Sequence, residues 1–142
     1  MNPQTLQQTI HDTIPISKHM GFTISSLSGQ QIKVTAPLPN NINIHGTAFA
    51  GSIYTIATLT AWGLAYSILQ DNNIEADLVL GEAHIKYRTP IKNDLLCMAN
   101  INDENHKAFI NKLNQKARGR LQIIVNINDA AQWEGKLIAI PH

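Results

Sequence analysis

Cysteine and charge are both scarce in this sequence. A single cysteine, Cys97, excludes an internal disulfide framework and fits a reducing compartment. Charged residues make up only 15% of the chain and the formal net charge is +1, so the basic excess that favours nucleic-acid binding is missing. The N-terminal residues lack both the basic start and the apolar run of a secretion signal. These absences predict a cytoplasmic protein without a nucleic-acid partner.

Lysine, arginine, aspartate and glutamate are all absent from residues 48–69, a long apolar segment. Its apolar residues are not confined to one stripe, which is typical of a helix that is buried on all sides or spans a membrane. About 20 residues suffice to cross a bilayer, so length alone does not separate the two. Because Gly, Ser and Thr interrupt the segment and no basic residues flank it closely, we predict a buried helix and no membrane partner.

Shorter helical and β-leaning segments surround this helix. Leu6, Ile10 and Ile14 follow one another at four-residue spacing, which predicts a helix over residues 3–13. Ile123 and Val125 alternate with polar or solvent-facing positions, as in a strand with one buried face. The remaining predictions are strands over residues 22–27, 31–38, 78–88, 95–101, 121–128 and 133–140, a helix over residues 103–115, and a turn over residues 129–132.

The order of these elements predicts the fold class. One long buried helix lies between groups of strands, which favours an α+β fold with a strongly curved antiparallel sheet wrapped around that helix. The chain of 142 residues with 44% hydrophobic content is large enough for one core. It has no internal repeat and no linker rich in Pro, Gly or Ser, so residues 1–142 are predicted to form a single domain.

Two segments resemble a known family. Residues 46–54, with the sequence GTAFAGSIY, follow Asn43 and are similar to the segment that leads into the central helix of hotdog-fold thioesterases. Residues 87–90, with the sequence YRTP, resemble the aromatic, basic and proline ending of the next strand in that family. Within that group, the chain resembles the thioesterase-like domain that is sometimes found fused to acetyltransferases in bacterial proteins. The resemblance covers essentially the whole chain and implies a hotdog fold.

The resemblance also implies a function. It points to a hydrolase of acyl-CoA or acyl-ACP (acyl carrier protein) thioesters, with coenzyme A or phosphopantetheine entering as part of the substrate and no separate cofactor. It implies a homodimer that joins two sheets edge to edge, with the sites at the dimer interface. Whether two such dimers associate into a tetramer stays open.

The start of the predicted helix is the predicted site. The first N–H groups of a helix have no acceptor within it, and the helix dipole favours negative charge there. Such donors can polarise a thioester carbonyl and hold the oxyanion that forms on attack. We therefore expect the backbone of Gly51 to act in catalysis and the neighbouring residues to bind substrate, namely Gly46, Thr47, Phe49 and Ala50. Alternatively, the glycines only allow a tight turn and close packing.

Two positions depart from the family pattern. The resemblance places Phe49 where commoner hotdog thioesterases carry a histidine, and Thr58 where they carry a catalytic Asp or Glu. A threonine hydroxyl cannot act as a general base near neutral pH, so another group, or the partner subunit, would have to activate water. Two alternatives avoid this step: a malonyl-thioester decarboxylase, or a module that binds acyl-thioesters without catalysis.

Histidine and asparagine side chains are the candidates to complete the site. His45 and His84 could act as the base, since the pKa of histidine lies closest to neutrality. His84 alternates with charged residues, so its strand face lines either the cleft or the solvent. Asn41 and Asn43 could donate hydrogen bonds to a carbonyl or hold a water, or could be ordinary turn residues.

Hydroxyl, thiol and cationic side chains complete the list of candidates. Ser52 and Tyr54 could orient substrate from the first turns of the helix, or bond back to its carbonyl groups. Cys97 is interpreted as a packed side chain, with a nucleophile as the alternative. Arg88 could meet the phosphates of coenzyme A or an acidic carrier protein. The histidines have no companions at metal-ligand spacing, so no metal is predicted.

Overall fold

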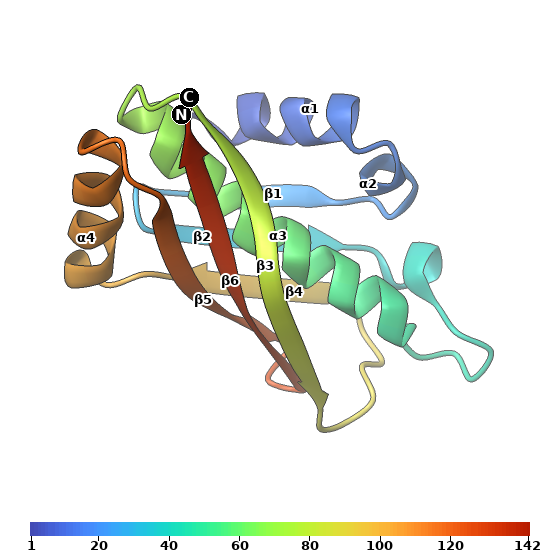
Figure 1. The fold of residues 1–142 in the computed structure, drawn as a ribbon. Coiled ribbons are helices and arrows are strands. Elements are labelled where there is room, and N and C mark those ends of the chain that lie inside the picture. Colours follow the sequence, from blue (N-terminus) through green and yellow to red (C-terminus); the bar gives the residue numbers. More distant parts are fainter.

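The computed structural model describes all 142 residues and places one long helix, α3 (Ala50–Asp71), inside a curved sheet (Figure 1). The sheet has six strands in the order β1-β2-β4-β5-β6-β3, and every neighbouring pair is antiparallel. The predicted α+β fold, with a curved antiparallel sheet around a buried helix, is confirmed. The strands are β1 Thr23–Leu27, β2 Gln31–Ala36, β3 Ala76–Tyr87, β4 Leu95–Asn100, β5 Gly119–Ile127 and β6 Ala131–Pro141.

Three shorter α-helices and one 3-10 helix complete the chain: α1 Pro3–Thr13, α2 Ile16–His19, η1 Leu38–Asn41 and α4 Asp103–Asn114. The predicted bounds of α1 are confirmed, because the side chain of Asn2 accepts the N–H of Thr5 and Pro3 occupies the first helical position. Helix α4 ends one residue before the predicted end, at Asn114. Helices α2 and η1 are short and were not expected.

Helix α3 forms the centre of the hydrophobic core. Along the helix, Ile56, Leu64 and Ile68 are completely buried. The sheet contributes the alternating residues Ile123 and Val125 of β5, which are 1% and 0% exposed, as the sequence predicted. By length and hydropathy α3 could cross a membrane, but 67% of its most apolar window is buried within the fold. The helix is therefore packed as the core helix of a domain.

The hairpin between β5 and β6 differs from the prediction. The predicted turn over residues 129–132 is wrong at its end, because β6 already begins at Ala131. Asn128 and Asp129 both adopt left-handed backbone angles, with φ of 54° each, and the N–H of Ala130 donates to the carbonyl of Ile127, so residues 128–130 reverse the chain. The N–H of Asp129 donates to Oδ1 of Asn126 and supports this tight turn.

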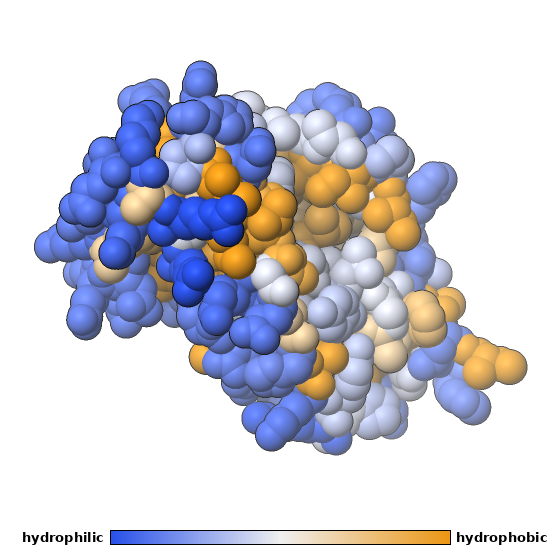
Figure 2. Space-filling view, in the orientation of Figure 1, coloured by the Kyte–Doolittle hydropathy of each residue, from blue (hydrophilic) through white to orange (hydrophobic).

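Strand β3 forms an edge of the sheet and leaves an apolar flank open. It pairs only with β6. The half-buried apolar residues of its inner face, Leu78 and Ile85 among them, lie on the side of α3 that carries Trp62 and Tyr66. The rings of Trp62 and Tyr66 stack with centroids 4.9 Å apart, and both remain half-buried. Figure 2 shows apolar surface gathered along β3 and the neighbouring part of the molecule.

Candidate functional site

The start of α3 presents unpaired N–H groups. Phe49 precedes the helix with extended backbone and provides no side-chain cap. The first hydrogen bond of the helix runs from the N–H of Ile53 to the carbonyl of Phe49, at 3.0 Å. The N–H groups of Ala50, Gly51 and Ser52 find no acceptor in the chain. These donors, at the positive end of the helix dipole, can bind an anion or a polarised carbonyl.

Long-range hydrogen bonds fix the segment before the helix. The N–H of Phe49 donates to the carbonyl of Asn41 at 2.7 Å, and the N–H of Ala48 to that of Ile91 at 2.8 Å. The side chain of Asn41 is buried and donates to the carbonyls of Met20 and Pro37. Asn41 thus holds the chain in front of α3, and its amide nitrogen donates within the chain.

A pocket of about 310 Å³ opens beside the start of α3. The two segments that carry the family resemblance both line this pocket: residues around the start of α3 form one side, and residues at the end of β3 form the other. Ile53 and Ile91 supply apolar lining and Tyr87 a hydroxyl. The lining residues are Asn43, Thr47, Ala48, Ala50, Ile53, Tyr87, Arg88, Thr89, Pro90 and Ile91. Of the predicted site residues, this pocket brings together Asn43, Thr47, Ala50 and Arg88.

Tyr87 is a pocket residue that the sequence prediction did not include. Its hydroxyl donates to the carbonyl of Ala50 at 2.9 Å and ties the end of β3 to the first turn of α3. Desolvation by burial raises the pKa of Tyr87, and the charge of Tyr54 raises it further. The phenol therefore stays protonated near neutral pH and remains a donor. Its place in the motif of residues 87–90 is the signal that could have identified it.

The pocket contains no side chain that can act as a general base near neutral pH. Tyr87 and Arg88 are its only ionisable lining residues, and no carboxylate or histidine lies among them. Tyrosine and arginine both titrate far above neutrality. The geometry of one chain can therefore bind and polarise a carbonyl, whereas the activation of water needs a group from outside this pocket.

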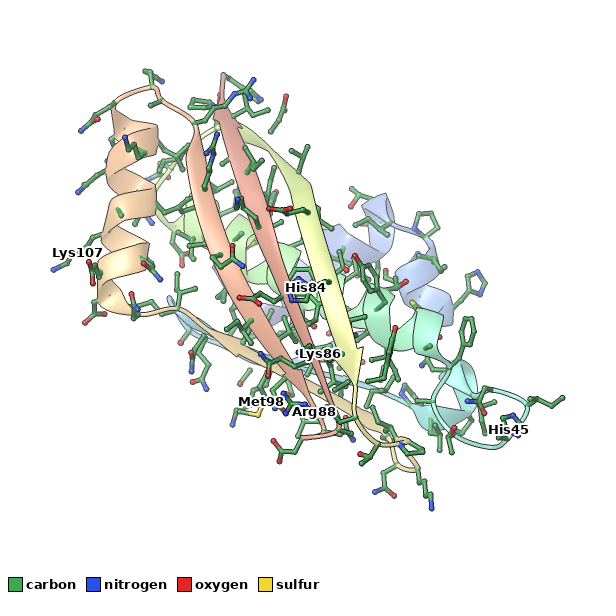
Figure 3. The ribbon with its side chains drawn as sticks, turned by 60° about the horizontal axis from the view of Figure 1, so that its bottom comes forward. His45, His84, Lys86, Arg88, Met98 and Lys107 are labelled. Carbon is green, nitrogen blue, oxygen red and sulfur yellow. The ribbon has the colours of Figure 1, made fainter.

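Asn43 organises the loop in front of the pocket. Its Oδ1 accepts the N–H groups of His45 at 2.8 Å and Thr47 at 3.1 Å, and its Nδ2 donates to the hydroxyl of Thr47 at 2.8 Å. Gly46 has a φ of 81°, which favours glycine. His45 lies exposed at the tip of this loop (Figure 3), and the neighbouring Ile44 is 93% exposed. In this arrangement the amide of Asn43 is occupied by its own loop, and His45 does not line the pocket.

The other predicted site residues lie outside the pocket lining. The hydroxyl of Thr58 donates to the carbonyl of Tyr54 at 2.9 Å, and both side chains are half-buried on α3. The ring of Phe49 lies over Gly51, where an added Cβ would come within 2.5 Å of it. Ser52 is buried in the first turn of the helix.

His84 lies on the outer face of β3, where its side chain is 68% exposed and its Nε2 lies 3.3 Å from a carboxylate oxygen of Glu134. Of the two faces considered for it, the structure places it on the solvent face. Cys97 is completely buried, and desolvation raises the pKa of its thiol from 9.0 to about 12, although a hydrogen bond with Thr60 acts in the opposite direction. A thiol that stays protonated is a poor nucleophile, so the packed side chain is the interpretation that the structure supports.

No group of three or more His, Cys, Asp or Glu side chains is arranged to hold a metal ion. The largest cavity, about 620 Å³, lies on the outer face of the sheet beside the start of α4, away from the helix donors of α3. Its lining includes the amide side chains of Gln31, Asn100 and Gln122. The pocket at the start of α3 is therefore the one that combines free backbone donors with apolar lining.

The fold and the donors at the start of α3 are those of the hotdog-fold thioesterase class. Residues 3–140 match the family described as "Putative thioesterase (yiiD_Cterm)", and the chain belongs to this family. Thioester hydrolysis is the general activity with which the family and its fold are associated.

Solved structures support this assignment. A "putative thioesterase" from Shewanella oneidensis is 34% identical, with 98% of this chain and 97% of that chain covered and a TM-score of 0.89. A protein of unknown function from Chlorobaculum tepidum is 28% identical, with 99% and 98% covered and a TM-score of 0.93. A thioesterase from Haemophilus influenzae, 16% identical with 99% and 92% covered and a TM-score of 0.73, shares the fold.

Proposed function

We propose that this protein is a cytoplasmic hydrolase of acyl-CoA or acyl-ACP thioesters in which the N–H groups at the start of α3 polarise the thioester carbonyl. The observation that carries the proposal is the position of these unpaired donors. Ala50 both begins the helix and lines the pocket, so its N–H can reach a carbonyl oxygen bound there. The apolar side chains of Ile53 and Ile91 would contact the first carbons of the acyl group.

The chemistry follows from these contacts. Attack of water on the carbonyl carbon would place negative charge on the carbonyl oxygen, and hydrogen bonds from Ala50 and Gly51 would stabilise it more than they stabilise the bound thioester. Collapse of this intermediate would break the carbon–sulfur bond and expel the thiolate, which would take up a proton to give the free thiol. The proton of the attacking water would go to a base outside the pocket, from the partner subunit or from solvent.

The lack of a base in the pocket favours a second candidate, the decarboxylation of a malonyl-thioester. Loss of CO₂ breaks a carbon–carbon bond without the removal of a proton, and it leaves an enolate that the same N–H donors would stabilise. The guanidinium of Arg88, at the edge of the pocket, has the geometry to bind a carboxylate. The third possibility, a binding module, would use the same donors without turnover.

One experiment distinguishes these functions. The purified protein would be incubated with acetyl-, long-chain acyl- and malonyl-thioesters of both coenzyme A and acyl carrier protein, and free thiol and CO₂ would be measured separately. Thiol without CO₂ is the result expected from the proposed hydrolase. Release of CO₂ from the malonyl substrate with the thioester intact would replace it by the decarboxylase, and tight binding without either product would leave only the binding module.

We propose further that the protein is a homodimer joined at the open edge of β3. The unpaired edge of this strand offers backbone hydrogen bonds, and the half-buried side chains of Leu78, Ile85, Trp62 and Tyr66 offer apolar area beside it. We expect sedimentation equilibrium to give twice the chain mass of 15.7 kDa. A Leu78→Asp variant should dissociate the dimer, since it would bury an unpaired charge in the proposed apolar interface. A monomeric wild-type protein at micromolar concentration would refute this assembly.

A further inference from the structure

Carboxylates lie beside two of the basic side chains on the outer face of β3 and β6. Glu82 lies 3.3 Å from the ammonium of Lys136 on the neighbouring strand β6. Two residues further along β3, His84 lies 3.3 Å from Glu134 of the same strand. Figure 3 shows that the row of basic side chains continues from His84 toward the end of β3. That end forms one wall of the pocket described above.

The last two cations of this row, Lys86 and Arg88, have no acidic partner. Lys86 lies opposite Gln132 in the strand register, and the guanidinium of Arg88 donates to Oε1 of the same glutamine at 3.3 Å. Asp129, in the turn between β5 and β6, forms an ion pair with neither cation. Two exposed positive charges therefore lie without an acidic partner at the end of β3, and one of them, Arg88, lines the pocket.

We propose that Lys86 and Arg88 bind the phosphate that links the pantetheine arm of the substrate to its carrier. The proposal rests on the proposed function, because the thioester in the pocket is what brings the arm past Arg88. A guanidinium offers paired N–H donors that match phosphate oxygens, and a lysine adds a point charge. Coenzyme A and carrier-bound phosphopantetheine share this 4′-phosphate, so the same contact serves both carriers.

Arg88 is the residue that connects the two parts of the site. It lines the pocket, while its side chain lies on the outer face with Gln132. Its N–H donates to the carbonyl of Ala130 at 2.8 Å, which fixes the backbone at this corner. A ligand that leaves the pocket around the end of β3 therefore meets Arg88 first and Lys86 next.

Calorimetric titration with coenzyme A, 4′-phosphopantetheine and pantetheine tests the proposal without relying on turnover. We expect phosphopantetheine to bind about tenfold more tightly than pantetheine, because only the former carries the phosphate. Lys86→Ala and Arg88→Gln should each weaken phosphopantetheine binding about fivefold, more at low salt than at high salt, and Lys86→Ala should leave pantetheine binding unchanged. Equal affinity for pantetheine and phosphopantetheine, or no binding of either at millimolar concentration, would overturn the proposal.

Lys107→Ala provides the matched control, since it removes one exposed cation from α4, away from the pocket (Figure 3). It should leave all three affinities unchanged. The titration of Lys86→Ala and Arg88→Gln is repeated with a holo carrier protein. An equal loss of affinity for coenzyme A and for the carrier protein supports binding of the shared phosphate. A loss of affinity for coenzyme A alone contradicts it. Thiol release measured in parallel distinguishes the two proposals. If Lys86→Ala releases thiol with an unchanged KM, the phosphate contact is refuted and the hydrolase is not. If the variants bind phosphopantetheine more weakly but the protein releases no thiol, the hydrolase is refuted and the phosphate contact is not.

Discussion

An Ala50→Pro variant is expected to lose about a hundredfold to a thousandfold in kcat while it keeps its fold. Ala50 is the first residue of α3, and its N–H lies at the pocket without an acceptor in the chain. Proline removes this donor and breaks no hydrogen bond of the helix. The preceding residue, Phe49, has a φ of −68° and a ψ of 132°, which is the extended conformation that a residue before proline prefers.

The measurement is steady-state kcat with the thioester that the wild-type protein converts fastest, together with a thermal melt. Because an enolate needs the same donor, the loss should appear in thiol release or in CO₂ release, whichever reaction the protein catalyses. Asp103→Pro is the matched control: it places proline at the first position of α4, after Asn102 with an extended ψ of 166°. If Ala50→Pro turned over as fast as this control, the N–H of Ala50 would not be a catalytic donor.

The central helix could be predicted from the sequence because burial on all sides leaves a segment without charge. Its ends could not be predicted, since they depend on distant contacts. The helix begins at Ala50 rather than at residue 48 because Phe49 is extended, with a ψ of 132°, and Ala48 is held in a strand-like bridge to Ile42 while its N–H donates to Ile91, far along the chain. At the other end it continues to Asp71, whose carboxylate pairs with the amino group of Met1. No local pattern contains either partner.

In the candidate site, too, features set by local sequence could be predicted, and features set by distant contacts could not. Free donors at the start of a helix follow from helix geometry alone, so the sequence predicted that they exist, but which N–H groups they are depends on the first residue of α3. Tyr87 lies 37 residues from Ala50, and only the curvature of the sheet around the helix brings its hydroxyl to that carbonyl. Asn43 is the opposite case: its Oδ1 accepts the N–H of His45 two residues on, a local turn that asparagine commonly forms. The turn interpretation of Asn43 was therefore available from sequence.

The pocket at the start of α3 has donors for negative charge but no side chain that can act as a base. With Thr58 bonded to the carbonyl of Tyr54 and His84 on the outer face, neither side chain supplies a base to the pocket of its own chain. Backbone donors, by contrast, need no particular side chain and survive substitution along the helix start. The stabilisation of negative charge is thus built into the fold, whereas proton transfer depends on groups that this chain does not place in the pocket.

The largest expected effect on stability is that of Gly135→Ala. Gly135 is buried in β6, and a Cβ there would lie 2.3 Å from the ring of Trp133, which is itself completely buried. The ring has no free space to move into, so the core must shift at a cost of about 3 kcal/mol. For a domain of this size the melting temperature should fall by roughly 10 °C. Thermal and urea unfolding measure both quantities.

Gly51→Ala is the instructive comparison, because its Cβ would also meet an aromatic ring, that of Phe49, at 2.5 Å. Phe49 is 53% exposed and can rotate into solvent, and alanine favours a helix over glycine by about 1 kcal/mol, so this variant should be neutral or slightly stabilised. Trp133→Phe removes the ring atoms that a Cβ at Gly135 would meet. In that background Gly135→Ala should cost less than it does alone, a coupling that a double-mutant cycle measures. If Gly135→Ala lowered the free energy of unfolding equally in both backgrounds, the clash with Trp133 would not be the cause of the destabilisation.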